Sequence, residues 1–508
     1  MKNTGKWTRM NFLVFLAVLL FVLGGTVFAG GGRQATASAN SGGPFKITIL
    51  TRQSTGEIPS ADNPAILAIE KIANVDLDIT FVPNAAYAEK LAVTVASNDY
   101  PMVTLFTGNS KPSTMEVEAV RAGLFWKVGD YLKRYKWLSE LDDNRIQNAS
   151  VDGELWGMFR WRPSVRDGFF YRKDWAEKLG IQPPKNMEEL YNMLKAFVEK
   201  DPDGNGRADT FGMAQEQSLG EVLQTLAPAF GLGNGYDEVN GKLIPIHLQP
   251  AYLEELKFIK RLYDNGLMNR DFPTIVEGRR DEMMGSGQYG MVIDSIDKGW
   301  FSIVPLQKIY PNATFTVQAN FADSKAPIWG RAGYDGKFYV SRKAVPDEAS
   351  FLKIMEYFDH MYSPEVNNIV YCGFEGTHYT KTGTNTITIN DEQRQRFGVD
   401  IQPMEQIAMR YQKNNYVIEN IPEYDKQLNY FYYDYPGEVV GNPTWVLDSE
   451  TYNERGTELG TLISDAVVQY VTGAIDDRGW AAVLDRWRRE GGDKIIAEYQ
   501  AEYDKIKR

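Results

Sequence analysis

The chain has 508 residues, a formal net charge of −12 at neutral pH and a single cysteine. The acidic balance argues against nucleic acid or anionic lipid as a partner, and one cysteine excludes an internal disulfide. The length is sufficient for roughly two or three domains.

The N-terminus has the pattern of an export signal. Basic residues within the first nine positions precede an unbroken apolar run, Phe12 to Leu23, and Val27-Phe28-Ala29 offers the small residues of a signal peptidase site. We therefore expect a signal peptide over 1–29 and a flexible tether over 30–44; the alternative is an uncleaved membrane anchor. The only cysteine, Cys372, lies far from the apolar run, so no lipid anchor is expected.

The next segment alternates between strand and helix patterns. Strands are predicted at 45–51, 77–82 and 102–106, and helices at 63–73 and 87–96. Such alternation predicts parallel pairing through right-handed crossovers, and hence an α/β fold. Ligands of such sheets bind beyond the carboxyl ends of the strands, so residues 51–53 and 107–109 lie near a possible site or form ordinary surface loops.

Four helices are expected further along the chain. Their ranges are 186–200, 252–265, 347–362 and 478–507, the last interrupted at Gly491-Gly492. Asn186 with Glu189 three residues later forms the pattern of a capping box, and Pro202 ends the first of these helices because it has no amide hydrogen.

An acidic loop follows that first helix directly. Asp201 to Asp209 places oxygen-bearing side chains at loop positions 1, 3, 5 and 9 and a glycine at position 6. This is the beginning of a calcium loop, because calcium prefers several hard oxygen ligands. Position 12 is Gly212 instead of the usual glutamate, so the EF-hand loop is incomplete. A structural calcium ion is expected here; the alternative is an Asx-rich turn without an ion.

Catalytic motifs are scarce. The three histidines are far apart, and the sequence contains no HExxH, GxSxG or GxxxxGK[ST] motif. A pair of carboxylates acting on a glycoside remains an alternative, because 67 acidic residues offer many combinations.

Aromatic residues, in particular tryptophans, also give information about the ligand. Several tryptophans lie beside charged residues or glycine, as in Arg160-Trp161-Arg162 and in the segment from Trp329 to Tyr334. Flat aromatic faces with polar groups at the rim suit sugar rings. The alternative is that most of these rings belong to the core.

Several segments together resemble family 1 extracellular solute-binding proteins. Val151 to Gly157 resembles their DGKxYGLP segment, and Phe170 to Gly180 resembles their RkDWLdkLG segment. The acidic loop, the GxEGxHY-like element Gly373 to Tyr379 and the final helix follow in the family's order. The resemblance covers nearly all of the chain after the signal peptide.

This resemblance implies a two-lobed α/β receptor, similar to the type II periplasmic-binding-protein fold, that closes on an oligosaccharide or other solute and delivers it to the permease of an ABC importer. The sequence is similar to alginate-oligosaccharide-binding proteins, in which a comparable loop holds calcium. The positions that match the calcium ligands are Asp201, Asp203, Asn205, Arg207 and Asp209. Thr210 departs from the acidic residue often found there.

We expect a first lobe of residues 45–160 with about 300–360, and a second lobe of 161–299 with about 361–508. Without a lipid-modified cysteine, a periplasmic protein is expected, as is a monomer. The alternatives to a sugar receptor are a secreted carbohydrate-active enzyme and a receptor for peptides or another solute.

Six residues are expected to bind the ligand. They are Arg52, Trp161, Trp300, Trp329, Arg331 and Glu375. The tryptophans would stack on sugar faces, and the charged residues would bind hydroxyls or carboxylates. Glu375 lies in the GxEGxHY-like element, which could instead be a structural turn.

Overall fold

The structure is a computed structural model that describes residues 43–53, 58–276, 279–321, 327–409, 416–420 and 423–506. The predicted signal peptide and nearly all of the tether lie outside these residues. Residues 45–508 form one unit. Across the described parts of the chain, no helix combines the length and the apolar character needed to cross a membrane.

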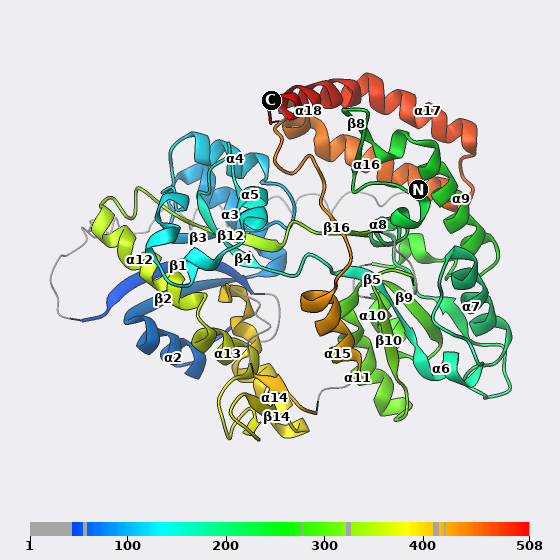
Figure 1. Ribbon diagram of the computed structural model, residues 1–508, viewed down its shortest axis with the longest axis horizontal. Coiled ribbons are helices and arrows are strands. Elements are labelled where there is room, and N and C mark those ends of the chain that lie inside the picture. The colour runs from blue at the N-terminus through cyan, green and yellow to red at the C-terminus, as the bar shows by residue number, and fades with distance from the viewer. Residues whose placement is uncertain are drawn as a thin grey trace, which may run out of the picture. The chain divides into compact units, whose positions relative to one another are not determined.

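The first sheet confirms the predicted α/β fold (Figure 1). Its strand order is β2 (Val75–Pro83), β1 (Phe45–Gln53), β3 (Val103–Phe106), β12 (Tyr334–Val340) and β4 (Gly157–Trp161). The first three strands are parallel, joined through α2 (Pro64–Ala73) and α3 (Asn84–Ser97) as the alternating pattern predicts. β12 runs antiparallel to both of its neighbours, which the sequence did not reveal.

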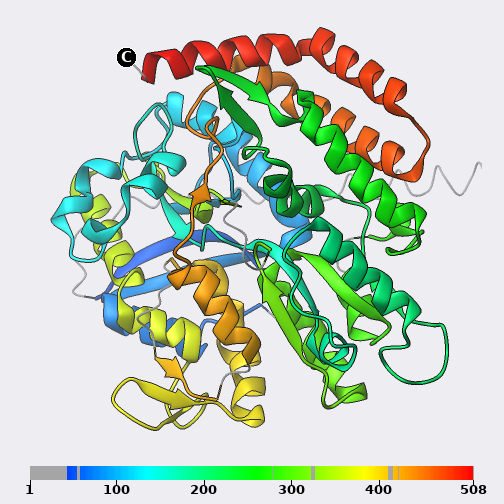
Figure 2. The same cartoon turned by 45° about the vertical axis from the view of Figure 1, so that its right-hand side comes forward.

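The second sheet is smaller and mixed. Its order is β10 (Phe315–Gln318), β5 (Asp167–Arg172), β9 (Tyr289–Ser295) and β6 (Phe211–Met213). The predicted capped helix is α7 (Met187–Glu199), which covers this sheet together with α8 (Gly220–Leu226). α9 (Pro250–Asp264) belongs to the same group of buried side chains and lies beside the C-terminal helices (Figures 1 and 2). The Asn186 side chain accepts a hydrogen bond from the Glu189 amide at 2.9 Å, as expected of an N-cap.

Groups of buried side chains surround the two sheets. The group around the first sheet combines residues of 47–159 with residues of 332–409, and it includes α12 (Glu348–Met361) and α13 (Pro364–Cys372). The predicted second lobe includes everything beyond about residue 361, whereas residues up to 409 pack in this first group. The predicted first lobe includes β10, whereas β10 pairs with β5. The lobe limits stay a prediction, but these two segments pack differently from what the prediction implies.

Two short connections run side by side. Residues 162–166 join β4 of the first sheet to β5 of the second. Residues 330–333 join β11 (Ile328–Trp329), which pairs with β16 (Val439–Val440) in a separate two-stranded sheet, to β12 of the first sheet. The Arg162 amide donates to the Gly333 carbonyl at 2.9 Å, and the Arg331 amide donates to the Ser164 carbonyl at 2.8 Å. We call these paired segments the connecting strands.

The C-terminal part of the described chain, from α16 (Glu450–Thr472) onward, is helical. α16 packs against α9 and is followed by α17 (Asp477–Trp487) and α18 (Asp493–Ile506) (Figure 2). The predicted interruption is confirmed, because Gly491 has a φ of 139°, a conformation that favours glycine. The Lys111 ammonium of the first lobe donates to the Tyr499 hydroxyl of α18 at 2.8 Å.

Candidate functional site

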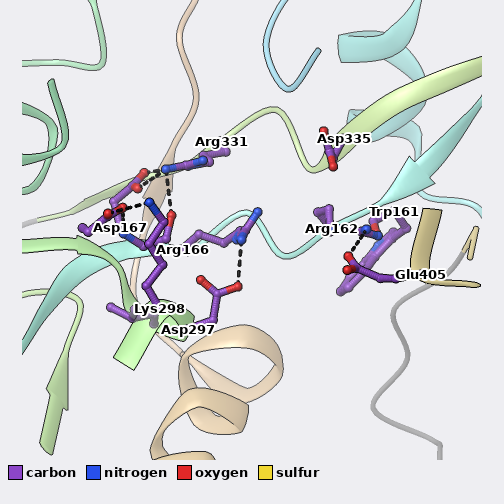
Figure 3. Close-up of polar contacts among 12 residues, drawn as sticks. Trp161, Arg162, Arg166, Asp167, Asp297, Lys298, Arg331, Asp335 and Glu405 are labelled. Carbon is purple, nitrogen blue, oxygen red and sulfur yellow. Dashed lines mark hydrogen bonds and ion pairs between the residues drawn. The ribbon is translucent and has the colours of Figure 1, made fainter. Parts of the chain in front are cut away.

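A strip of arginine and carboxylate side chains follows the connecting strands between the two sheets (Figure 3). We call it the charged strip. Its members are Arg52, Arg160, Arg162, Arg166, Asp167, Asp294, Asp297, Lys298, Arg331, Asp335 and Glu405. In a chain with a net charge of −12, this concentration of guanidinium groups is a local exception.

At the first-sheet end, Asp335 lies between two arginines. Its carboxylate is 2.8 Å from Arg52 and 3.3 Å from Arg160. Burial alone would raise the pKa of Asp335, but the charges of Arg160 and Arg52 outweigh burial and lower it. Burial also lowers the pKa of Arg160, but an arginine begins from a pKa above about 12 and stays protonated. Gln406 accepts a further bond from Arg52 at 2.8 Å.

Two further ion pairs of the strip involve arginines of the first connecting strand. Arg162 binds Glu405 at 2.9 Å, and Arg166 binds Asp297 at 2.7 Å. Burial works against both positive charges, but the carboxylates outweigh it and raise the pKa of each arginine. Arg166 therefore points from the connection toward the second lobe, where Asp297 follows β9.

At the second-sheet end, Arg331 binds Asp167 through two nitrogens and donates to the Ser295 hydroxyl at 3.1 Å. Beyond it, Asp294 lies between the buried Arg280 and Lys298, with the lysine at 2.9 Å. Asp294 and Ser295 are the last residues of β9, and β6 runs parallel to β9. The carboxyl ends of these strands therefore face the strip, which is the usual position of a ligand in such sheets.

Exposure separates the arginines that a ligand can reach from those that support them. The side chains of Arg52, Arg166 and Arg331 are 20%, 21% and 18% exposed. Those of Arg160 and Arg280 are 0% and 1% exposed. The first three side chains are therefore reachable from solvent, whereas protein covers the other two, which pair with carboxylates of the strip.

The predicted tryptophans have different environments. Trp161 ends β4 beside the strip and is only partly buried. Trp329 is 5% exposed in the core of the second lobe, where its indole donates to the Leu232 carbonyl at 3.1 Å. Protein therefore covers the Trp329 ring, one of the three rings that were expected to stack on sugar. Trp300 lies in α11 (Gly299–Ile309), but its side chain is outside the described part of the structure.

Glu375 lies apart from the charged strip. Its side chain is 57% exposed and its ionic partner is Lys381, at 3.7 Å. His378 of the same element is buried, accepts a bond from the Phe374 amide at 3.0 Å and contacts the Asp400 carboxylate at 3.1 Å. These bonds favour the alternative interpretation of the GxEGxHY-like element, a structural turn.

The structure brings Arg52, Trp161 and Arg331 to the strip, and it adds residues that the sequence analysis missed. These are Arg160, Arg162, Arg166, Asp167, Asp294, Asp297, Lys298, Asp335 and Glu405. The available signal was the concentration of three arginines within residues 160–166. The carboxylates carried no local signal, because their partners lie far away in the sequence, as with Arg52 and Asp335.

The acidic loop has the donor chemistry of a calcium site. The Asp201 carboxylate accepts bonds from the Gly204, Asn205 and Gly206 amides, as a tight loop around one point requires. The Asn205 amide nitrogen lies 2.8 Å from Asp203 and 3.1 Å from Asp209. The Asn205 amide group thus bridges two carboxylates of the kind that calcium prefers as ligands.

Other observations limit this site. Within the described ranges, no group of three or more His, Cys, Asp or Glu side chains is arranged to hold a metal ion. Thr210 is buried, and its hydroxyl donates to the Phe197 carbonyl at 2.8 Å, so it faces α7 and away from the loop. The residues fit calcium in chemistry, with Asp201, Asp203, Asn205, Asp209 and the Arg207 carbonyl as donors.

Two cavities lie away from the strip. One of about 820 Å³ lies between α8, α9 and the C-terminal helices, and its lining includes Tyr236, His247, Tyr252 and Trp487. The other, of about 490 Å³, is lined by first-lobe residues including Arg121 and by the segment that contains Asp448.

Comparison with known proteins agrees with this architecture. The family model described as bacterial extracellular solute-binding protein matches residues 54–368. The polygalacturonan/rhamnogalacturonan-binding protein YtcQ of Bacillus subtilis is 31% identical, over 97% of this chain and 99% of that protein. Lipoprotein LipO of the same organism is 28% identical to this chain, over 96% of this chain and 97% of LipO.

A solved structure supports the fold. The solute-binding protein associated with an HMO-binding ABC transporter of Bifidobacterium longum infantis aligns with a TM-score of 0.71 and 18% identity. The alignment covers 91% of this chain and 99% of that chain. The family model and the similarity to YtcQ together show that the chain belongs to the family of bacterial extracellular solute-binding proteins.

Proposed function

We propose that the protein is the substrate-binding receptor of an ABC importer and that its ligand is an oligosaccharide that carries carboxylates. The receptor role follows from the family. The ligand would lie against the charged strip, in contact with residues of both lobes. Contact with both lobes favours the closed arrangement, because a ligand shifts a conformational equilibrium by its differential affinity.

Arg166 carries the proposal of an acidic ligand. Of its five N–H donors, only one is engaged among the described residues, in the bond to Asp297. Its guanidinium is partly exposed between the two sheets. Guanidinium groups bind carboxylates through paired N–H groups, so a uronate sugar suits this position. The name of YtcQ, a polygalacturonan/rhamnogalacturonan-binding protein, supports the same class.

An enzymatic role is less well supported. A glycosidase needs one carboxyl group that stays protonated near neutral pH. The strip carboxylates named above each have a cationic partner, and the pKa of Asp335 is lowered. We therefore expect stoichiometric binding without release of product.

We also propose a structural calcium ion in the loop 201–209 and a monomer that works outside the cytoplasmic membrane, in the periplasm. Family membership supports export. Mass spectrometry of the exported protein checks the location, since a mature chain that begins at Gly30 would establish cleavage.

Titration calorimetry tests the main proposal. The purified protein is titrated with galacturonate oligosaccharides and, separately, with neutral fructo-oligosaccharides of equal length. We expect one site per chain for the acidic series, weaker binding of the neutral series and unchanged sugar by chromatography. Stronger binding of the neutral series would overturn the acidic class, and shortened sugar would establish an enzyme.

A further inference from the structure

Two aromatic rings from different lobes lie parallel beside the charged strip. Trp161 ends β4 of the first sheet, and Tyr433 lies in η8 (Tyr430–Asp434). Their ring centroids are 6.1 Å apart and their planes differ by 6°. The Arg145 guanidinium lies 4.7 Å from the centroid of the Trp161 ring. The Trp161 ring, one of the three that the sequence predicted to stack on sugar, is thus already in contact with protein groups.

The packing of α15 (Glu423–Asn429), which precedes η8, places Tyr433 with the second lobe. The Tyr424 hydroxyl donates to the Ile296 carbonyl, and Gln427 accepts a bond from the Val317 amide at 2.8 Å. In both views, α15 lies beside the second sheet (Figures 1 and 2). The Trp161–Tyr433 contact therefore links the lobes without using the connecting strands.

The separation of the two rings decides what can lie between them. Carbon atoms in contact are about 3.5–4.0 Å apart, so a sugar ring between two aromatic planes needs about 7–8 Å. The planes of Trp161 and Tyr433 cannot be farther apart than their centroids, which is 6.1 Å. No sugar ring fits between these two rings as they stand. A sugar that stacks on this face of Trp161 must therefore move Tyr433.

We propose that Tyr433 occupies the stacking face of Trp161 that a sugar ring takes in the complex. Tyr433 then competes with the ligand and holds the two lobes together when no ligand is bound. This inference rests on the proposed function, because it takes the ligand to be a sugar beside the strip. Exchange of one stacked ring for another keeps Trp161 covered in both states, so the contact sets affinity and lobe position together.

The variant Tyr433→Ala tests the competition. Since an aromatic pair contributes a two- to tenfold change in an equilibrium constant, we expect galacturonate oligosaccharides to bind the variant about two- to tenfold more tightly. The matched control is Tyr430→Ala in the same element, because the Tyr430 ring is 44% exposed and contacts Phe431 and Tyr435. This control should bind as the parent protein does. Unchanged or weaker binding by Tyr433→Ala would overturn the proposal.

A second readout needs no ligand. The signal measured is the quenching of Trp161 fluorescence by acrylamide. For the parent protein, Tyr433→Ala and Tyr430→Ala, it is obtained by subtracting the quenching of the same protein with the added substitution Trp161→Phe. We expect this quenching to increase in Tyr433→Ala and to stay constant in Tyr430→Ala. No increase would show that Tyr433 does not cover Trp161, and would overturn the inference. If the parent protein binds none of the oligosaccharides, the proposed function fails while the quenching still measures the ring contact.

Discussion

Arg166 is the residue on which the proposed ligand contact depends most. It is partly exposed, lies on the connection between the two sheets, and binds Asp297 through one nitrogen. The neighbouring Arg160 is fully buried and binds the backbone carbonyls of Asp335 and Glu405 at 3.0 Å. Two arginines of one short segment therefore have different environments, one partly open to solvent and one covered by protein.

The variant Arg166→Gln should bind galacturonate oligosaccharides about 10- to 100-fold more weakly, because a hydrogen bond to a charged group contributes about 1.5–3 kcal/mol. Calorimetry measures the change. The control is Arg261→Gln, which breaks an exposed 2.7 Å pair with Glu188 far from the strip and should leave affinity intact. Equal affinities of Arg166→Gln and the parent protein would remove Arg166 from the site.

His247 shows how burial sets a pH dependence. Its ring packs edge-on against the Trp487 ring, with the two ring centroids 4.4 Å apart, and both residues line the cavity of about 820 Å³. Burial, followed by the charge of Arg488, lowers the pKa of His247 to about 3. Between pH 6.5 and about 3 the unfolded chain therefore binds a proton that the folded chain does not bind. Stability that is present above pH 6.5 is lost progressively as the pH falls through this range.

Replacing this histidine should reduce the pH dependence. From pH 6.5 to pH 5, the protonation of His247 in the unfolded chain lowers the free energy of unfolding by on the order of 2 kcal/mol. The free energy of unfolding of His247→Gln should therefore fall by about 2 kcal/mol less than that of the parent protein. Urea unfolding of both proteins at pH 7 and pH 5 measures the difference. Identical losses would mean that the pKa of His247 is not lowered in the folded protein.

At the residue scale, the sequence predicted Arg52, Trp161 and Arg331 because each lies near a strand end or a charged aromatic cluster. The burial of Trp329 was not predictable, because an isolated tryptophan carries no mark that separates core from surface. The carboxylates of the strip were not predictable, because ion pairs such as Arg162–Glu405 join positions 243 residues apart.

At the scale of single elements, the acidic loop makes a separable prediction. Removing calcium should lower the melting temperature, by about 2–4 °C for each kcal/mol of binding free energy, while ligand affinity stays nearly constant. The loop follows α7 and lies outside the charged strip, so its ion would stabilise the second lobe only.

Differential scanning calorimetry with and without a chelator measures this shift. Asp203→Asn should remove the response to the chelator, and Asp264→Asn, which alters an exposed lysine pair at 3.0 Å on α9, should keep it. A melting temperature that does not respond to calcium at millimolar concentration would reduce the loop to an Asx-rich turn.

Local patterns predicted the elements well where neighbours in sequence are also neighbours in space. The first three strands, α2 and α3 agree with the expected ranges to within a few residues. The antiparallel strand β12 was missed, because it enters the sheet between β3 and β4 from more than 170 residues further along the chain. Its burial on both faces leaves no alternation to detect.

At the scale of the whole molecule, the α/β fold and the family were predictable from motifs in order. Which segments pack in which lobe was not, because each lobe combines distant parts of the chain. Residues 332–409 return to the first core after an excursion of roughly 170 residues through the second sheet. The charged strip is a product of that return, since one of its ends depends on Asp335 and Glu405.

A crystal structure of the protein with a galacturonate oligosaccharide tests the central claim most directly. We predict a sugar carboxylate within about 3 Å of the Arg166 guanidinium, a sugar ring against Trp161, and contacts to both lobes. A ligand bound in the cavity beside His247, or on the outer face of one lobe with Arg166 still paired only with Asp297, would contradict the account.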